Sequence, residues 1–210
     1  MTLRIAAALS VALGAAALLA FLHVLGEGPF ASAEARHLRA MKDRTAAPSE
    51  VTPTSLEAMA ALPHARSLAD YETIERRGVS LEGYVQHLLR ASDGDLHLEV
   101  VANPVSPAGW DTAYVTAEIT PSVRRSAPGW SYETLVERFH PRLGGVTPWA
   151  DGTRRVRLTG WLLYDWQYDH PTHPGRPGPA AARLTGWEIH PVTRIEVWSA
   201  ARSRFEDVPR

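Results

Sequence analysis

From Gly78 onward, apolar and polar residues alternate with a period of two, and this alternation constrains the fold more than any other feature of the chain. In GVSLEGYV (78–85), Val79, Leu81 and Val85 alternate with mostly polar neighbours. Such a pattern is typical of a β-strand that buries one face. The pattern recurs in four more segments: DLHLEV (95–100), AYVTAEIT (113–120), RRVRLTGWLLYDW (154–166) and ARLTGWEIHPVTRIEVW (182–198). We therefore predict five strands, with a bulge or bend at Gly83 and at Pro191.

A helix is predicted between the third and fourth strands. Ser131 is a suitable N-cap, Glu133 lies in the first turn, and Leu135 and Phe139 supply one apolar face. The order is then β-β-β-α-β-β, which is that of a five-stranded OB-like barrel. A β-sandwich would need about seven strands. We expect a mainly β domain over residues 71–200, built from antiparallel strands, with residues 201–210 as a C-terminal tail.

The N-terminal segment predicts where in the cell the protein is located. Residues 5–25 carry no Asp, Glu, Lys or Arg, and a helix of this length could cross a bilayer. Residues 1–33 are therefore either a signal anchor or a signal peptide cleaved near Ala33. We expect a domain exported across the cytoplasmic membrane, and either held there by a transmembrane helix or secreted. Residues 34–70, with short helices and two prolines in 47–54, form a predicted stalk or linker.

Several of the strand sequences carry a resemblance. GVSLEGYV, DLHLEV, RVRLTGWLLYD and above all GWEIHPVTRIEV resemble a group of uncharacterised bacterial exported or membrane-associated proteins. The resemblance covers about residues 75–198. It implies an OB-like domain and carries no activity with it.

Composition excludes some classes of function. The chain has 22 Lys+Arg against 23 Asp+Glu and no cysteine. Balanced charge disfavours a nucleic-acid partner, and the absence of cysteine excludes disulfides, thiolate nucleophiles and Cys-ligated metals. No P-loop, dinucleotide fingerprint or nucleophile elbow is present, so the chain is not assigned to an enzyme class.

The polar positions of the predicted strands provide a candidate site. One face of strands two, three and five collects two imidazoles and three carboxylates: His97, Glu99, Glu118, Glu188 and His190. Histidine nitrogen and carboxylate oxygen suit zinc or manganese, so His97, Glu118, Glu188 and His190 are candidate ligands of a divalent metal. The alternatives are an ordinary solvated outer face, or a structural, hydrogen-bonded His190. His170 and His173 could form a second metal site in a loop, although a solvated loop is the better reading.

Aromatic residues provide a second candidate site. Trp161 and Trp187 follow matching Thr-Gly-Trp triplets, which could place both rings on one face near Tyr114. Such a face could stack bases or sugars, whereas packing in the core is the commoner use of tryptophan.

Two functions from different classes remain. The first is an envelope-located OB-like binding module, without a cofactor, for a protein or glycan partner. The alternative is a divalent-metal-dependent hydrolase, or another metal-binding enzyme, that uses the His/Glu cluster.

Overall fold

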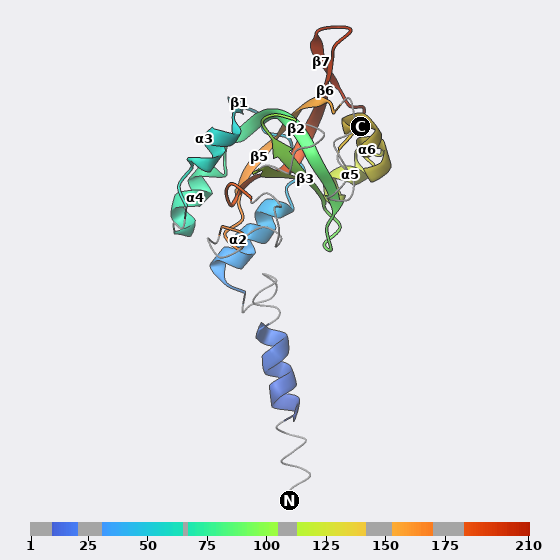
Figure 1. Cartoon of the computed structure of the whole chain (residues 1–210). Coiled ribbons are helices and arrows are strands. Elements are labelled where there is room, and N and C mark those ends of the chain that lie inside the picture. Colours follow the sequence, from blue (N-terminus) through green and yellow to red (C-terminus); the bar gives the residue numbers. More distant parts are fainter. Residues whose placement is uncertain (1–9, 21–30, 65–66, 105–112, 142–152, 170–182) are drawn as a thin grey trace, which may run out of the picture. The chain divides into compact units, whose positions relative to one another are not determined.

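The computed structural model of the chain describes residues 10–20, 31–64, 67–104, 113–141, 153–169 and 183–210. The chain divides into two compact units, residues 1–41 and residues 42–210 (Figure 1). The described part of the first unit is helical over residues 10–20 and in α2 (Ala33–Lys42), whose last residue belongs to the second unit. Every strand within the described residues lies in the second unit.

The second unit is built on a closed barrel of five strands. These are β2 (Gly78–Arg90), β3 (Leu96–Val101), β4 (Val115–Ile119), β5 (Arg155–Tyr164) and β6 (Trp187–Ser199). Hydrogen-bonded neighbours follow the order β2-β3-β4-β6-β5, and β5 pairs with β2 to close the ring. The helices α5 (Pro121–Arg125) and α6 (Tyr132–Phe139) lie between the third and fourth barrel strands along the chain. This confirms the predicted barrel and its β-β-β-α-β-β order, which is that of an OB fold.

The prediction that all strands are antiparallel is wrong at one junction. β4 pairs with β6 in parallel, with Ala117 opposite Ile189, whereas the other barrel pairings are antiparallel. Alternation of polar and apolar residues gives the face of each strand but not the direction of its neighbour. The parallel pair is possible because α5, α6 and β5 separate β4 from β6 along the chain.

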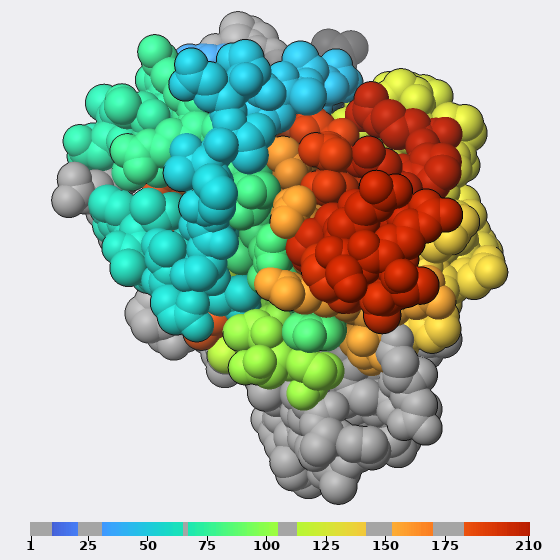
Figure 2. Space-filling view, turned by 90° about the horizontal axis from the view of Figure 1, so that it is seen from above, coloured from blue at the N-terminus to red at the C-terminus, as the bar shows by residue number. Residues whose placement is uncertain are grey.

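Two short strands extend the sheet beyond the barrel. β1 (Val51–Thr54) pairs in parallel with β2, and β7 (Arg204–Asp207) pairs antiparallel with β6. Segments that we assigned to a stalk and to a tail thus each contribute a strand. In Figure 2, the chain from β1 through the helices α3 (Leu56–Ala60) and α4 (Leu68–Ile74) covers one side of the view, and the C-terminal strands cover the other.

The strands bend close to the predicted positions. Opposite Pro191, the register between β5 and β6 shifts on both sides of Gly160. A Cβ atom at Gly160 would lie 2.2 Å from the carbonyl oxygen of Pro191, so only glycine fits this approach. In β2 the shift lies between Val85 and His87, two residues after Gly83, whose own Cβ would lie 2.6 Å from the Val101 oxygen.

Local rules explain the helix starts. The side chain of Ser131 accepts a hydrogen bond from the Thr134 backbone N–H at 3.1 Å, which confirms the predicted N-cap of α6. Ser55 caps α3 in the same way. Thr120 caps α5, a helix that the sequence analysis did not predict.

The core lies inside the barrel and under the helices. The apolar residues that alternate along the second and third predicted strands are fully or almost fully buried: Leu96, Leu98, Val100, Val115, Ala117 and Ile119. Leu135 and Phe139 of α6 join the same cluster. Burial of aliphatic side chains on one face of each strand is therefore as the two-residue period predicts.

Arg44 ties the chain ahead of β1 to the barrel. Its guanidinium donates to three backbone carbonyl oxygens, those of Glu75 and Leu162 at 3.0 Å each and that of His190 at 2.9 Å. It also lies over the ring of Trp161, 5.1 Å from the ring centroid. One side chain thus contacts segments that are far apart in sequence.

Among the described residues, no helix combines the length and the apolarity needed to cross a bilayer. The predicted span covers residues 5–25, and the described part of it, residues 10–20, is helical. Residues 5–9 and 21–25 lie outside the described residues.

Candidate functional site

The polar residues singled out from the sequence lie together on the outer face of β3, β4 and β6. His97 on β3 is directly opposite Glu118 on β4. Glu188 and His190 lie on either side of Ile189, which points into the core. Since neighbouring residues of a strand point to opposite faces, all four side chains are directed away from the core.

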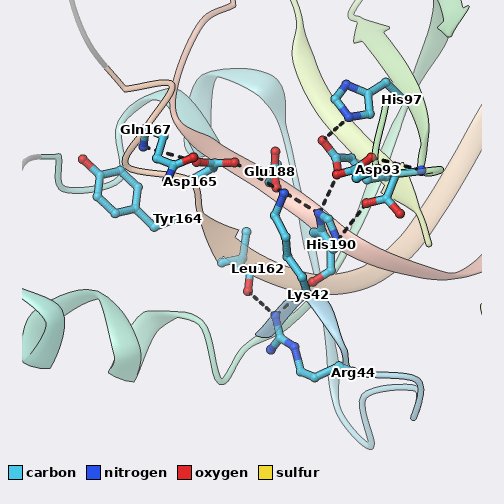
Figure 3. Close-up of polar contacts among 12 residues, drawn as sticks. Lys42, Arg44, Asp93, His97, Leu162, Tyr164, Asp165, Gln167, Glu188 and His190 are labelled. Carbon is cyan, nitrogen blue, oxygen red and sulfur yellow. Dashed lines mark hydrogen bonds and ion pairs between the residues drawn. The ribbon is translucent and has the colours of Figure 1, made fainter. Parts of the chain in front are cut away.

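These four side chains form one chain of contacts. One carboxylate oxygen of Glu118 lies 2.8 Å from Nε2 of His97, and the other lies 2.9 Å from Nδ1 of His190. Nδ1 of His190 is also 3.0 Å from a carboxylate oxygen of Glu188. Figure 3 shows His97, Glu188 and His190 directed toward one another, together with Lys42. The four candidate ligands predicted on one face of the strands are therefore in contact with one another.

This face is not a solvated surface. The side chains of Glu188 and His190 are 0% exposed and that of Glu118 is 2% exposed, whereas His97 is 30% exposed. The alternative of an ordinary outer face is therefore wrong for three of the four residues. We refer to eight residues as the polar cluster: His97, Glu118, Glu188 and His190, together with Lys42, Asp95, Asp165 and Arg183.

Four more charged residues complete the polar cluster, and none of them was among the four metal ligands predicted on the strands. Asp95 lies 3.6 Å from Nε2 of His190, Arg183 bonds to Glu188, and Lys42 lies 3.8 Å from Asp165. The position of Asp95 could have been predicted from the alternation, because it is two residues before His97 and should therefore point to the same face. Lys42 is the last residue of α2, and Asp165 and Arg183 lie outside β5 and β6, although the strands predicted at 154–166 and 182–198 included them.

Glu99 was predicted on the same face but takes part in a different contact. Its carboxylate lies 2.6 Å from Nδ1 of His87 and accepts from the Gln86 side chain at 3.2 Å. This His87–Glu99 pair lies across the β2–β3 ladder. It is a natural control for experiments on the polar cluster.

The cluster shifts the pKa values of its members. Burial alone would lower the pKa of His190, but the charges and hydrogen bonds of Glu118 and Glu188 raise it to about 10, so the imidazole is a cation at neutral pH. Burial raises the pKa of Glu118, but His190 and His97 outweigh it and hold this pKa well below its usual value. Glu118 is therefore charged.

The two aspartates of the cluster behave differently. Burial, with the nearby charge of Glu118, raises the pKa of Asp95 to about 7 against the opposing effect of His190. Burial and the charge of Glu188 raise the pKa of Asp165 to about 6. Burial lowers the pKa of Lys42, but the surrounding carboxylates raise it above its usual value overall. Acidic and basic groups are thus held close together with little water to separate them.

The predicted aromatic face does not form. Trp187 is fully buried in the core, where its ring lies 4.9 Å from that of Tyr164 and its Nε1 donates to the Pro63 carbonyl at 2.9 Å. Trp161 points to the other face of the sheet. Tyr164 is opposite Trp187 and shares its face, and Trp161 is three residues before Tyr164 on the same strand, so its side chain points the opposite way. Its Nε1 donates to the Ala46 carbonyl at 2.7 Å. Tyr114 forms a bridge with Arg183 and is half-buried. Packing is therefore the role of Trp187.

A different set of exposed side chains lies beside the polar cluster. Trp166, Tyr168 and Leu184 are 40%, 53% and 40% exposed and lie on the connection between β5 and β6. The guanidinium of Arg183 lies over the Tyr168 ring, 5.1 Å from its centroid. We call Trp166, Tyr168 and Leu184 the apolar rim. His170 and His173, the second metal candidates, lie outside the described residues.

Comparisons with known proteins add little to the strand order. No protein-family model matches the chain, and no curated protein is detectably similar to it. One similar solved structure is the asparaginyl-tRNA synthetase of Entamoeba histolytica, at 15% identity and a TM-score of 0.36. The match covers 70% of this chain and 24% of that chain, so this chain spans about a quarter of that protein's length. The fold assignment therefore rests on the strand pairings alone.

Proposed function

We propose that the protein is an OB-type binding module, located in the cell envelope, that binds a glycan or protein partner at the apolar rim. The observation that carries this proposal is the exposure of Trp166, Tyr168 and Leu184 on one connection between strands. In OB folds, the loop between the fourth and fifth barrel strands is one of the two loops that contact ligands. Here that loop is the β5–β6 connection.

The described part of this connection is held in place by hydrogen bonds. The backbone N–H of Asp165 donates to the Gly186 carbonyl at 2.9 Å, and the Gly186 N–H donates to the Asp169 carboxylate at 2.9 Å. Nδ1 of His64 lies 2.7 Å from the same carboxylate. A fixed platform loses less conformational entropy on binding than a mobile one, which favours affinity.

The chemistry of the rim favours an uncharged ligand. Aromatic faces bind sugar rings and apolar side chains, whereas the carboxylates of the adjacent polar cluster disfavour phosphates. Arg183, whose guanidinium lies over the Tyr168 ring, is already paired with Glu188. A nucleic-acid partner is therefore not proposed.

Binding at the rim is testable without knowledge of the natural partner. We expect Trp166→Ala with Tyr168→Ala to weaken binding at least tenfold for ligands found by screening a glycan array and envelope proteins. Phe205→Ala, which removes a half-buried aromatic ring on β7, is the matched control and should leave binding unchanged. Equal affinity of the rim variant and the wild type would exclude the rim as the binding surface.

The envelope location is supported by the apolar residues 5–25, which carry no formal charge. We expect a protease added to cells with a permeabilised outer envelope to degrade residues 42–210 while the cytoplasmic membrane is intact. Protection of this unit until the cytoplasmic membrane is lysed would contradict the proposed location.

A metal-dependent hydrolase is the second candidate, because it would use the polar cluster. Hydrolysis at a metal needs a coordination position open to substrate. The burial of Glu118, Glu188 and His190 leaves little room for one. The cluster is better suited to holding an ion than to converting a substrate.

A further inference from the structure

We propose that Asp95, Glu118 and His190 form a closed binding site for one divalent cation, zinc or manganese, that stabilises the outer face of β3, β4 and β6. The site does not depend on the proposed function, since it involves no residue of the apolar rim. It also differs from the set expected from the sequence, because it includes Asp95 and gives Glu188 and His97 another role.

The three residues are close enough to share one ion. One potential ligand atom from each lies within 4.8 Å of the other two, and all three side chains are buried. Nε2 of His190 and Oδ2 of Asp95 are 3.6 Å apart. Two ligand atoms that are each about 2.0–2.1 Å from a tetrahedral zinc lie about 3.3 Å apart, so the His190–Asp95 distance is already close to that spacing.

A buried ring nitrogen of His190 that makes no hydrogen bond within the described part of the chain indicates where the ion would bind. The side chain of His190 is 0% exposed, and its Nε2 makes no hydrogen bond to any residue that the structure describes. A buried polar atom without a partner is unfavourable and calls for an explanation. The Asp95 carboxylate lies 3.6 Å from this nitrogen. An ion between these two groups would satisfy both.

The surrounding residues orient the ligands as in known metal sites. A metal-binding histidine usually donates its other ring N–H to a carboxylate, which fixes the ring and its tautomer. Here Nδ1 of His190 is 3.0 Å from Glu188, whose other carboxylate oxygen is held by Arg183. We therefore assign Glu188 as the positioning residue of His190.

His97 plays the same part for Glu118. Its Nε2 lies 2.8 Å from Oε1 of Glu118, which fixes the carboxylate beside His190. When the ion binds, the proton on Nε2 of His190 and any proton on Asp95 leave to solvent, and the lone pair of that nitrogen goes to the metal. The two ligand carboxylates then offset the charge of the divalent ion.

The site is tested on the full-length protein, freed of metal with a chelator and kept in mild detergent because of its apolar segment. Zinc and manganese are each added alone, and binding is followed by calorimetry and by thermal unfolding. We expect one equivalent of one of these ions to bind. The melting temperature should rise by about 5 °C or more when free metal exceeds the dissociation constant a hundredfold.

Variants separate ligands from positioning residues. His190→Gln and Asp95→Asn, which keep the size of the side chains, should abolish the melting-temperature shift and the stoichiometric binding. Glu188→Gln and His97→Gln should bind the ion about 10–100 times more weakly, as for residues that orient metal ligands. Far-ultraviolet circular dichroism identifies any variant that fails to fold, and two ligand variants are used so that one folded protein suffices.

Two controls make the result specific. Glu99→Gln changes the neighbouring His87–Glu99 pair and should leave metal binding intact. The double variant His170→Ala with His173→Ala should also bind normally. The proposal is overturned if neither ion binds the wild type, if His190→Gln and Asp95→Asn bind as well as the wild type, or if binding is lost in the double variant instead.

Discussion

Replacing His190 by alanine is expected to lower the free energy of unfolding by about 3–5 kcal/mol, the range for removing one partner of a buried ion pair. His190 is fully buried, and it contacts Glu118 at 2.9 Å and Glu188 at 3.0 Å. Its loss leaves two carboxylates close together without the cation between them. Chemical denaturation of wild type and variant in metal-free buffer measures the difference.

A double-mutant cycle separates this electrostatic effect from lost packing. Glu118→Gln and His190→Gln are measured singly and together, and a coupling of about 1–3 kcal/mol is expected for two residues in one network. Arg202→Gln, which changes an exposed ion pair with Glu206, is the control and should alter stability by less than about 1 kcal/mol. A loss below about 1 kcal/mol for His190→Ala would show that the cluster does not stabilise the barrel.

The stability of the metal-free protein is expected to fall as the pH rises from about 6.5 to 10. The pKa of His190 is raised to about 10 in the folded chain, against an ordinary value of 6.5 in the unfolded chain. The stabilisation from its bound proton is fully present below pH 6.5 and is lost as the pH rises through the folded pKa. Each unit of pKa difference corresponds to about 1.4 kcal/mol, so a decrease of about 2–4 kcal/mol is expected between pH 6 and pH 9.5.

The charged groups around His190 also contribute to the pH dependence of stability. Glu118 on β4 and Glu188 on β6 face its Nδ1, Asp95 faces its Nε2, and Lys42 lies in the same cluster. The pKa of Asp95 is raised to about 7, so the stability that it contributes is also lost with rising pH, between about 4 and 7. Denaturation at several pH values tests the slope, which should become shallower above pH 7 in His190→Gln. A wild-type slope of zero would mean that His190 is uncharged at neutral pH.

The alternation of residues was sufficient to predict the barrel strands and their inner faces. Leu96, Leu98 and Val100 are inward, as expected, because each strand must bury its apolar side. The cap at Ser131 was also predictable, since an N-cap depends only on residues three apart. Features set by neighbouring residues are therefore accessible from the sequence.

Features set by distant segments were not accessible. The direction of the β4–β6 pair depends on how the chain returns to the barrel, and alternation does not record it. The outward direction of Glu118 and His190 was predicted, but their burial was not. Three other charged residues of the cluster, Lys42, Asp165 and Arg183, lie outside the barrel strands, where Lys42 pairs with Asp165 and Arg183 with Glu188. Trp161 and Trp187 were misplaced because matching triplets do not imply matching positions in a paired sheet.

The bonds of Arg44 to the carbonyls of Glu75, Leu162 and His190 bear on how this domain could be moved between proteins. A graft that starts at the first barrel strand, Gly78, would omit both Arg44 and Lys42. The Leu162 and His190 carbonyls would lose the hydrogen bonds from Arg44, and Asp165 would lose its contact with the Lys42 ammonium. The transplantable unit consequently begins at Lys42, well upstream of the barrel itself.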